Sequence, residues 1–375
     1  MAPRIRLIVT SSFGLEAVVK NEVLDLGFRD VVMSDGKVEF DAEIKDIPLL
    51  NIWLRAADRV LLKLGEFPAD DFGKLFDGTR ALPWEDWFIQ DAMITVIGKS
   101  VKSKLLSVRT CQSIVKKAII ERLKEKLSAD ILPETGPEFT VQVALYKDVA
   151  QLTLDTSGAG LHKRGYRTTI GEVPIRENLA AAMLLLASLD RNEPLIDPMC
   201  GSGTILIEAA MMARNIAPGL KREFASEKWP VIDKLFWDEA RHAAREAISL
   251  EGPLQLFGYD IDPARIADCR VNAKRAGVDK DIVFAQQDIC SLKLEAPSGT
   301  MVSNPPYGIN LLKPEDLVPI YHALNNMFKD RPAWALYIIT ADRRFPQYFK
   351  RSQPDKIRKL FNGTLEVHYY QYYGK

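Results

Sequence analysis

The fold of this 375-residue chain is decided by the stretch LIDPMCGSGT, Leu195–Thr204. Its first two residues read as the end of a buried strand, and Gly201 and Gly203 permit a tight turn and close approach of a ligand to the backbone. An apolar helix, 205–213, follows and offers free N–H groups at its start. No G-x-G-x-x-G occurs and no Lys follows the glycines, which argues against dinucleotide and P-loop sites. A ligand with an amino acid head group fits better, with its ammonium on Asp197 and its carboxylate at the helix N-terminus.

Beyond this turn, strand-like and helical segments alternate. The strand-like runs are 254–259, 282–285, 301–303 and 334–340, and the helical runs are 263–276 and 317–328. Such alternation predicts an α/β domain with a mostly parallel sheet and helices on both faces. The turn Asn362-Gly363 between two further runs predicts a C-terminal antiparallel hairpin. Residues 214–253 form an insertion before the second strand, with a helix expected at 238–250.

Acidic residues end the second and third strands of this domain. Asp260 is placed to hold ribose hydroxyls, while Asp262, directly before Pro263, is expected to cap the next helix. Asp288 could accept a hydrogen bond from an adenine amino group, with Ile289 against the ring; an N-cap or a solvated loop acid is the alternative. Because such sheets bind ligands at the carboxyl ends of their strands, these positions together indicate one ligand site.

The fourth strand runs into Asn304-Pro305-Pro306-Tyr307-Gly308. Two successive prolines donate no backbone hydrogen bond and hold the chain stiff. The side-chain oxygen of Asn304 and the carbonyl of Pro305 could accept both hydrogens of one exocyclic amine and aim its lone pair outward, while Tyr307 stacks on the attached ring. This pattern favours methyl transfer to a planar amine. A plain strand-to-turn stop is the alternative, since N-P and P-P are common turn signals.

Composition sets limits on the class of protein. The chain is 47% hydrophobic and 27% charged with zero net charge, so nucleic-acid binding would depend on local patches. Its four cysteines form no C-x-x-C pair and its four histidines show no metal-ligand spacing, which argues against disulfides and zinc. Cys200 has no identifiable base, so a buried small residue is a better interpretation than a nucleophile. Without a signal peptide or a run of roughly 18 apolar residues, we expect a cytoplasmic protein.

The N-terminal half divides into two small α+β units, 1–65 and 66–160. Basic residues are concentrated in the second unit, where nine between residues 99 and 126 face two acidic ones, and in His162-Lys163-Arg164-Gly165-Tyr166-Arg167. Basic side chains with an interleaved aromatic suit RNA, although a solvated helix face or a linker pinned by salt bridges would look similar. The side chains expected to contact RNA are Lys99, Lys102, Lys104, Arg109, Lys116, Lys117, Lys163, Arg164 and Arg167.

Taken together, the motifs carry a family resemblance that covers nearly the whole chain. Asp197–Thr204, Gly258–Asp262, Gln287–Asp288 and Asn304–Gly308, in that order, resemble class I S-adenosylmethionine-dependent amino-methyltransferases. The N-terminal layout, with 154–158 and 161–167, resembles the THUMP-containing RNA methyltransferases. The inserted segments 215–219 and 224–229 resemble the branch that methylates guanine N2 of bacterial large-subunit ribosomal RNA. One departure is the 63 residues between Asp197 and Asp260, which the insertion explains.

The resemblance implies a fold, a cofactor and a substrate. A Rossmann-like methyltransferase domain at 161–375 would follow a ferredoxin-like region at 1–65 and a THUMP domain at 66–160. S-adenosylmethionine would be bound, without a metal, by Asp197, Cys200, Gly201, Ser202, Gly203, Thr204, Asp260, Ile261, Asp288, Ile289 and Asn304. Catalysis would rest on Asn304, Pro305, Pro306 and Tyr307.

The implied reaction is methylation of guanine N2 in 23S ribosomal RNA, with ribosomal RNA or a ribosome assembly intermediate as the partner. Alternatives of the same class are adenine-N6 methylation of RNA or DNA, guanine-N2 methylation of tRNA, and methylation of a protein glutamine. A different alternative is a non-catalytic RNA-binding assembly factor. Asn-Pro-Pro-Tyr alone does not separate these substrates, whereas the basic N-terminal half favours a structured nucleic acid.

Overall fold

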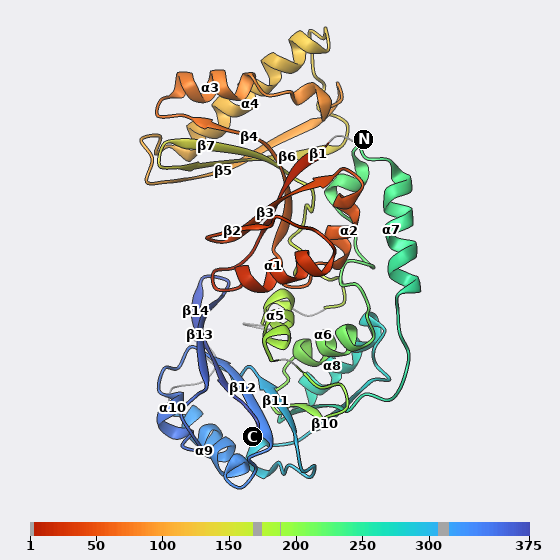
Figure 1. The fold of residues 1–375 in the computed structure, drawn as a ribbon, viewed down its shortest axis with the longest axis vertical. Helices are drawn as coiled ribbons and strands as arrows, with labels where there is room; N and C mark the ends of the chain where they lie inside the picture. The colour runs from red at the N-terminus through yellow and green to blue at the C-terminus, as the bar shows by residue number, and fades with distance from the viewer. Residues whose placement is uncertain (1–3, 168–174, 188, 307–314) are drawn as a thin grey trace.

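The computed structural model describes residues 4–167, 175–187, 189–306 and 315–375. Figure 1 shows an elongated molecule in which the N-terminal units lie above the C-terminal unit. The first unit contains β1 (Arg4–Thr10), α1 (Glu16–Asp25), β2 (Val32–Ser34), β3 (Lys37–Glu43), α2 (Asp46–Trp53) and β4 (Arg59–Pro68). Alternating apolar residues such as Leu7, Val9 and Phe40 are fully buried, which is the pattern of a sheet covered on one face.

The second unit continues the same sheet. Its elements are α3 (Phe72–Arg80), η1 (Trp84–Asp86), β5 (Met93–Val101), α4 (Val108–Lys126), β6 (Glu138–Tyr146) and β7 (Val149–Asp155). Strand β4 pairs with β1 on one side and β7 on the other, which gives one seven-stranded sheet in the order β2-β3-β1-β4-β7-β6-β5. Helix α4 begins earlier than the expected residue 113, because Ser107 caps it by accepting the Thr110 N–H.

The C-terminal unit has a second seven-stranded sheet, ordered β10-β9-β8-β11-β12-β14-β13. Its strands are β8 (Leu195–Asp197), β9 (Leu256–Asp260), β10 (Ile282–Gln286), β11 (Gly299–Ser303), β12 (Trp334–Thr340), β13 (Lys356–Asn362) and β14 (Leu365–Tyr372). The pairs among β8 to β12 are parallel, and β14 pairs antiparallel with β12 and β13. The expected α/β class and terminal antiparallel hairpin are therefore confirmed.

Helices cover this sheet on both faces. They are α6 (Thr204–Ala213), α8 (Pro263–Ala276), α9 (Leu317–Phe328) and the short α10 (Phe345–Tyr348), with the turn η3 (Ile289–Ser291). Helix α5 (Glu177–Ala187) was not expected from the sequence. It is buried on nearly every side, and it packs on α6 and reaches α1 of the first unit (Figure 1). A helix that is apolar all round lacks the stripe by which amphipathic helices are identified.

The insertion fastens the C-terminal unit to the N-terminal ones. It contains η2 (Ala225–Lys228) and α7 (Lys234–Glu246), which lies alongside α2 (Figure 1). The helix begins before the expected residue 238, because Asp233 caps it at the Leu235 N–H. Trp229 is fully buried, its ring stacks on Phe139 with centroids 4.6 Å apart, and its indole N–H donates to the Glu138 carbonyl at 3.1 Å.

Candidate active site

Asp197 lies at the end of β8 in the centre of the sheet. It is 1% exposed, and its Oδ1 accepts the Ser303 hydroxyl at 2.9 Å and the Met199 N–H at 3.3 Å. Burial raises its pKa to about 7, and the nearby carboxylate of Asp260 adds to the effect. None of the residues that the structure describes gives Asp197 a cationic partner, and a buried unpaired carboxylate is costly, so this position suits a ligand that brings a positive charge.

The glycine turn that follows leaves one side open. Gly201 and Gly203 have φ values of +54° and +78°, which favour glycine, and Gly203 caps α6. A Cβ at Gly201 would meet no heavy atom within 4 Å, whereas one at Gly203 would press on Cys269 and Phe284 at 3.2 Å. The turn therefore packs against the protein at Gly203 and offers free space at Gly201.

Cys200 belongs to the packed side of this turn. It is 6% exposed, and its Sγ lies 3.6 Å from that of Cys269, which in turn donates to the Gly201 carbonyl at 3.1 Å. The hydrogen bond with Cys269 and burial raise the pKa of the Cys200 thiol far above its ordinary value. The burial of Cys200 agrees with the expected role of a buried small residue, since a thiol with a raised pKa is a poor nucleophile.

Asp260 at the end of β9 is tied to the same turn. Its Oδ2 accepts the Gly201 N–H at 2.9 Å and its Oδ1 the Asp262 N–H at 3.0 Å, and burial raises its pKa. Asp262 caps α8 by accepting the Ala264 N–H, as predicted. Between them, Ile261 is 65% exposed. This edge therefore presents a carboxylate beside an uncovered apolar side chain, which suits a nucleoside.

The end of β10 differs in part from the expectation. Asp288 is exposed and caps η3, because its Oδ1 accepts the Cys290 N–H at 2.8 Å. Ile289 is only 7% exposed and packs into the core with Met301 and Leu317. Its side chain is therefore a core residue and not a free face for an adenine ring, which corrects the prediction; Ile261 has the exposure that this role requires.

The acceptor motif begins directly after β11. Pro305 is buried, and the Asn304 Oδ1 is a buried atom that has no hydrogen-bond partner among the residues that the structure describes. A buried unpaired oxygen costs free energy unless a donor reaches it, so this atom marks a place for a ligand N–H. Tyr307 of the predicted motif lies outside the described residues.

Ser303 was missed at the sequence level. Its hydroxyl is fully buried and donates to Asp197, so it joins the end of β11 to the end of β8. The sequence signal was present, because Ser303 is the polar end of an otherwise apolar strand and directly precedes Asn304. The site therefore unites a buried acid, a glycine turn with open space, and an unpaired amide oxygen on adjacent strands, which fits the amino acid group and nucleoside of S-adenosylmethionine.

Family models match the chain in three places. One described as "RMKL-like, methyltransferase domain" matches residues 164–371, an "RlmL ferredoxin-like domain" matches 6–61, and a THUMP domain matches 69–155. The chain belongs to the THUMP-containing RNA methyltransferases. Its cofactor is S-adenosylmethionine, and its Rossmann-like domain follows ferredoxin-like and THUMP domains as expected.

Relatives of this THUMP methyltransferase resemble it along its whole length. A Bacillus subtilis (strain 168) protein named "Putative RNA methyltransferase YpsC" is 42% identical and covers 98% of this chain and 96% of its own. The crystal structure of SMU.472, assigned as a methyltransferase and complexed with SAH, is 40% identical with a TM-score of 0.94, covering 100% and 99% of the two chains. A Listeria monocytogenes structure, described as a predicted N6-adenine-specific DNA methylase, is 43% identical with a TM-score of 0.94, covering 100% and 97%.

The structure separates eight of the nine side chains predicted to contact RNA in this THUMP methyltransferase into two groups, and the ninth, Lys116, is half-buried. Exposed side chains, which stay available for RNA, are Lys99, Lys102, Lys104, Arg109, Lys117 and Lys163. Several of the predicted residues have acidic neighbours: Lys116 pairs with Glu134 at 2.8 Å, and Lys104 with Asp70 at 3.3 Å. Such surface pairs are weak and exchangeable, so they do not by themselves exclude a phosphate.

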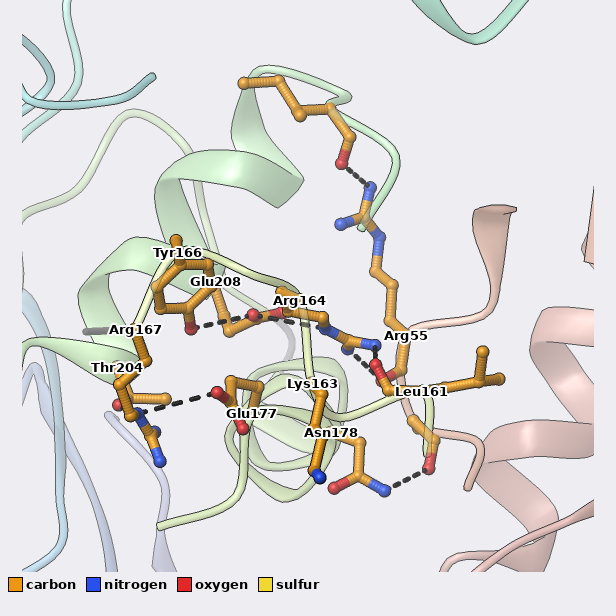
Figure 2. Close-up of polar contacts among 12 residues, drawn as sticks. Arg55, Leu161, Lys163, Arg164, Tyr166, Arg167, Glu177, Asn178, Thr204 and Glu208 are labelled. Carbon is orange, nitrogen blue, oxygen red and sulfur yellow. Dashed lines mark hydrogen bonds and ion pairs between the residues drawn. The ribbon is translucent and has the colours of Figure 1, made fainter. Parts of the chain in front are cut away.

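Arg164 and Arg167 form the second group and correct the prediction of RNA contact. Arg164 is 3% exposed and donates to the carbonyls of Leu161 and Arg55 and to the Glu208 carboxylate. The Arg167 guanidinium donates to Thr204 and lies beside Glu177. In Figure 2, Arg164 reaches toward Arg55 of the first unit, whereas Arg167 points toward Glu177 and Thr204 within the C-terminal unit. The alternative of a linker held by salt bridges is therefore correct for these two residues, because both guanidinium groups bind protein groups.

Among the described residues, every helix is too short or too polar to span a membrane. Within the same residues, no group of three or more His, Cys, Asp or Glu side chains is arranged to hold a metal ion.

Proposed function

We propose that this methyltransferase modifies the exocyclic N2 of a guanine in 23S ribosomal RNA, with Asn304 as the acceptor-site residue. The buried Oδ1 of Asn304 carries the proposal, because it has no partner within the described part of the chain and an exocyclic amine supplies the N–H donor that it requires. Pro305 and Pro306 support the proposal, since neither has a backbone N–H that would compete with the amine for the Asn304 oxygen. The choice of guanine and of a ribosomal substrate rests on the resemblance of segments 215–219 and 224–229 to the large-subunit guanine-N2 branch, and the chain also matches an RlmL ferredoxin-like domain.

The chain's own residues would act by positioning. Asn304 Oδ1 and the Pro305 carbonyl would accept from the two amine hydrogens, so the nitrogen lone pair points away from the motif. Tyr307 would stack on the flipped base. Asp197 and Ser202–Thr204 would hold the amino acid group of the cofactor, and Asp260, Ile261 and Asp288 its nucleoside. The bound cofactor supplies an electrophilic methyl group on its own leaving group, so no strong base is required.

RNA binding and catalysis would be carried out by different parts of the chain. We assign residues 1–65 and 66–160 to RNA binding and 161–375 to catalysis. In the second unit the exposed basic side chains would contact phosphates, and a ribosomal substrate would place the protein in the cytoplasm. A second candidate reaction is adenine-N6 methylation, which the name of the Listeria relative favours.

The test combines labelled S-adenosylmethionine with 23S ribosomal RNA lacking the modification, tRNA and duplex DNA, followed by mass spectrometry of the product nucleoside. We expect N2-methylguanine in ribosomal RNA only. N6-methyladenine would establish the second candidate, and RNA binding without cofactor binding would establish a non-catalytic factor.

The residue assignment is tested with Asn304→Ala. We expect turnover to fall about 100-fold or more, because one misplaced contact at the reacting group costs this much. Affinity for S-adenosylhomocysteine should stay near that of the wild type. Asn304→Asp serves as a matched variant that keeps the size and one acceptor oxygen. Full turnover by the Ala variant would reject the role of Asn304.

A further inference from the structure

Arg167 contacts Thr204, the first residue of α6. Its Nη2 donates to Thr204 Oγ1 at 2.7 Å and to the Ile175 carbonyl at 2.8 Å, and its Nε lies 3.6 Å from Glu177. These groups are largely buried, as Thr204 is 2% exposed and the Arg167 side chain 14% exposed. Figure 2 shows the guanidinium between Glu177 and Thr204.

The chemistry of Arg167 sets a direction for the hydroxyl groups beyond it. A guanidinium only donates, so Thr204 Oγ1 is the acceptor in this contact. The next oxygen, Ser202 Oγ, lies 3.0 Å from Thr204 Oγ1. Once Thr204 has accepted from Arg167, its own proton is best placed toward Ser202. Ser202 then accepts from Thr204 and keeps its own proton for another acceptor.

Ser202 is well placed to use that proton on a ligand. It is partly exposed and lies between Gly201 and Gly203, in a turn that is open on the Gly201 side. The adjoining start of α6 adds unpaired N–H groups and the positive end of the helix dipole. The Ser202 hydroxyl, the free N–H groups and the helix dipole all favour an anion, and the cofactor carries one carboxylate.

We propose that Arg167 is a positioning residue whose contact with Thr204 directs the Ser202 hydroxyl toward the carboxylate of S-adenosylmethionine. The inference rests on the proposed placement of the cofactor's amino acid group at the glycine turn. Arg167 does not touch the ligand; it orders the relay Arg167–Thr204–Ser202 so that every hydroxyl proton points the same way.

The rest of the junction holds Arg167 in place. The Tyr166 hydroxyl donates to Glu208 Oε1 at 3.1 Å, and Arg164 Nε to the same atom at 3.5 Å. Glu208 is fully buried on α6, one turn beyond Thr204. Arg164 also donates to the Arg55 carbonyl of the first unit. The segment 161–167 thus contacts two successive turns of α6, at Thr204 and Glu208, and also binds the N-terminal half.

The test is calorimetry on the full-length protein with two probes. S-adenosylhomocysteine carries the carboxylate, whereas 5′-methylthioadenosine lacks the whole amino acid group. We expect Ser202→Ala, Thr204→Val and Arg167→Met each to weaken S-adenosylhomocysteine roughly 10-fold, the range of one hydrogen bond to a charged group. Binding of 5′-methylthioadenosine should stay unchanged, and Thr204→Ser, which keeps the hydroxyl, should behave like the wild type.

A double variant separates a relay from independent contacts. Because the groups act in series, Thr204→Val combined with Ser202→Ala should weaken binding no more than Ser202→Ala alone. Additive losses, or equal losses for both probes, would overturn the relay. The test does not depend on Arg167→Met remaining folded, since the Ser202 and Thr204 variants keep Arg167 itself and the contacts of Arg164 and Tyr166 with Glu208.

Failure of the cofactor placement gives a different result. If Asp197→Asn also leaves the affinity for S-adenosylhomocysteine unchanged, the amino acid group does not lie at this turn and the proposed site is wrong. If Asp197→Asn weakens binding while the Ser202 and Thr204 variants do not, the placement holds and the relay alone is rejected.

Discussion

Replacement of Asp197 by Asn should stabilise the cofactor-free protein and weaken its binding of cofactor. Asn has the same shape, and its Oδ1 can still accept from the Ser303 hydroxyl and the Met199 N–H. The substitution removes the charge and puts an NH2 group in the place of Oδ2. Since the Asp197 carboxylate is buried without a cationic partner among the described residues, its charge is a cost to the folded state until the cofactor ammonium arrives.

The size of this cost follows from the pKa of Asp197. Burial raises it from 3.8 to about 7 in the folded protein. Each pKa unit corresponds to about 1.36 kcal/mol, so the difference amounts to about 4 kcal/mol. Because the folded pKa is the higher one, the penalty is absent below pH 3.8, grows as the pH rises and is complete above about pH 7.

Urea unfolding of both proteins without cofactor, at several pH values from 5 to 8, measures this effect. We expect the free energy of unfolding of Asp197→Asn to exceed that of the wild type by a margin that increases with pH and levels off at about 4 kcal/mol. Asp262→Asn is the matched control, an exposed carboxylate at the same edge whose capping role Asn can fill. A margin that does not change with pH would refute the reasoning.

Cofactor binding provides a second readout of the same carboxylate. Its ionised form should pair with the cofactor ammonium, so affinity for S-adenosylhomocysteine should fall as the pH drops below about 7. Binding near neutral pH should release protons, seen as a binding enthalpy that varies with the ionisation enthalpy of the buffer. Asp197→Asn should abolish both effects, and persistence of either would assign the titration to another group.

Two further predictions concern RNA binding and the insertion. Changing Lys99, Lys102 and Arg109 to Gln should weaken RNA binding and reduce the salt dependence of its affinity by about 0.7–0.9 per lost phosphate contact, measured by filter binding at several salt concentrations; an unchanged slope would exclude these side chains as contacts. Trp229→Ala should cost about 3–5 kcal/mol of unfolding free energy, because it removes a fully buried ring stacked on Phe139. Trp229→Phe should keep much of it, and equal losses for both would argue against stacking as the source.

Most strands and helices of the C-terminal unit could be predicted from short patterns in the sequence. The strand ends at Asp197, Asp260 and Asn304 could be recognised because apolar runs and turn residues lie next to one another in the chain. Parallel strands then bring their carboxyl ends to one edge, so the site followed from the order of the motifs. Helix α5 escaped this approach because burial on all sides leaves no amphipathic stripe.

The basic residues show the limit of the same approach. Lys99 and Arg164 contribute the same positive charge to a sequence pattern, yet Lys99 is exposed and Arg164 is 3% exposed within the junction. Exposure depends on which distant segments close over a side chain, and Arg164 is covered by groups such as the Arg55 carbonyl and Glu208. The burial of Ile289 likewise depends on residues far away in the chain, such as Leu317.

By itself, the sequence determined the class of fold, the glycine turn, the acidic strand ends and the Asn-Pro-Pro-Tyr motif, because each depends on neighbours in the chain. Tertiary structure alone decided that β4 joins the two N-terminal units into one sheet and that Ser303 connects Asp197 to the acceptor strand. It alone decided that Arg167 serves Thr204 and not RNA. Each of these depends on contacts between residues far apart in sequence, whose partners no local pattern specifies.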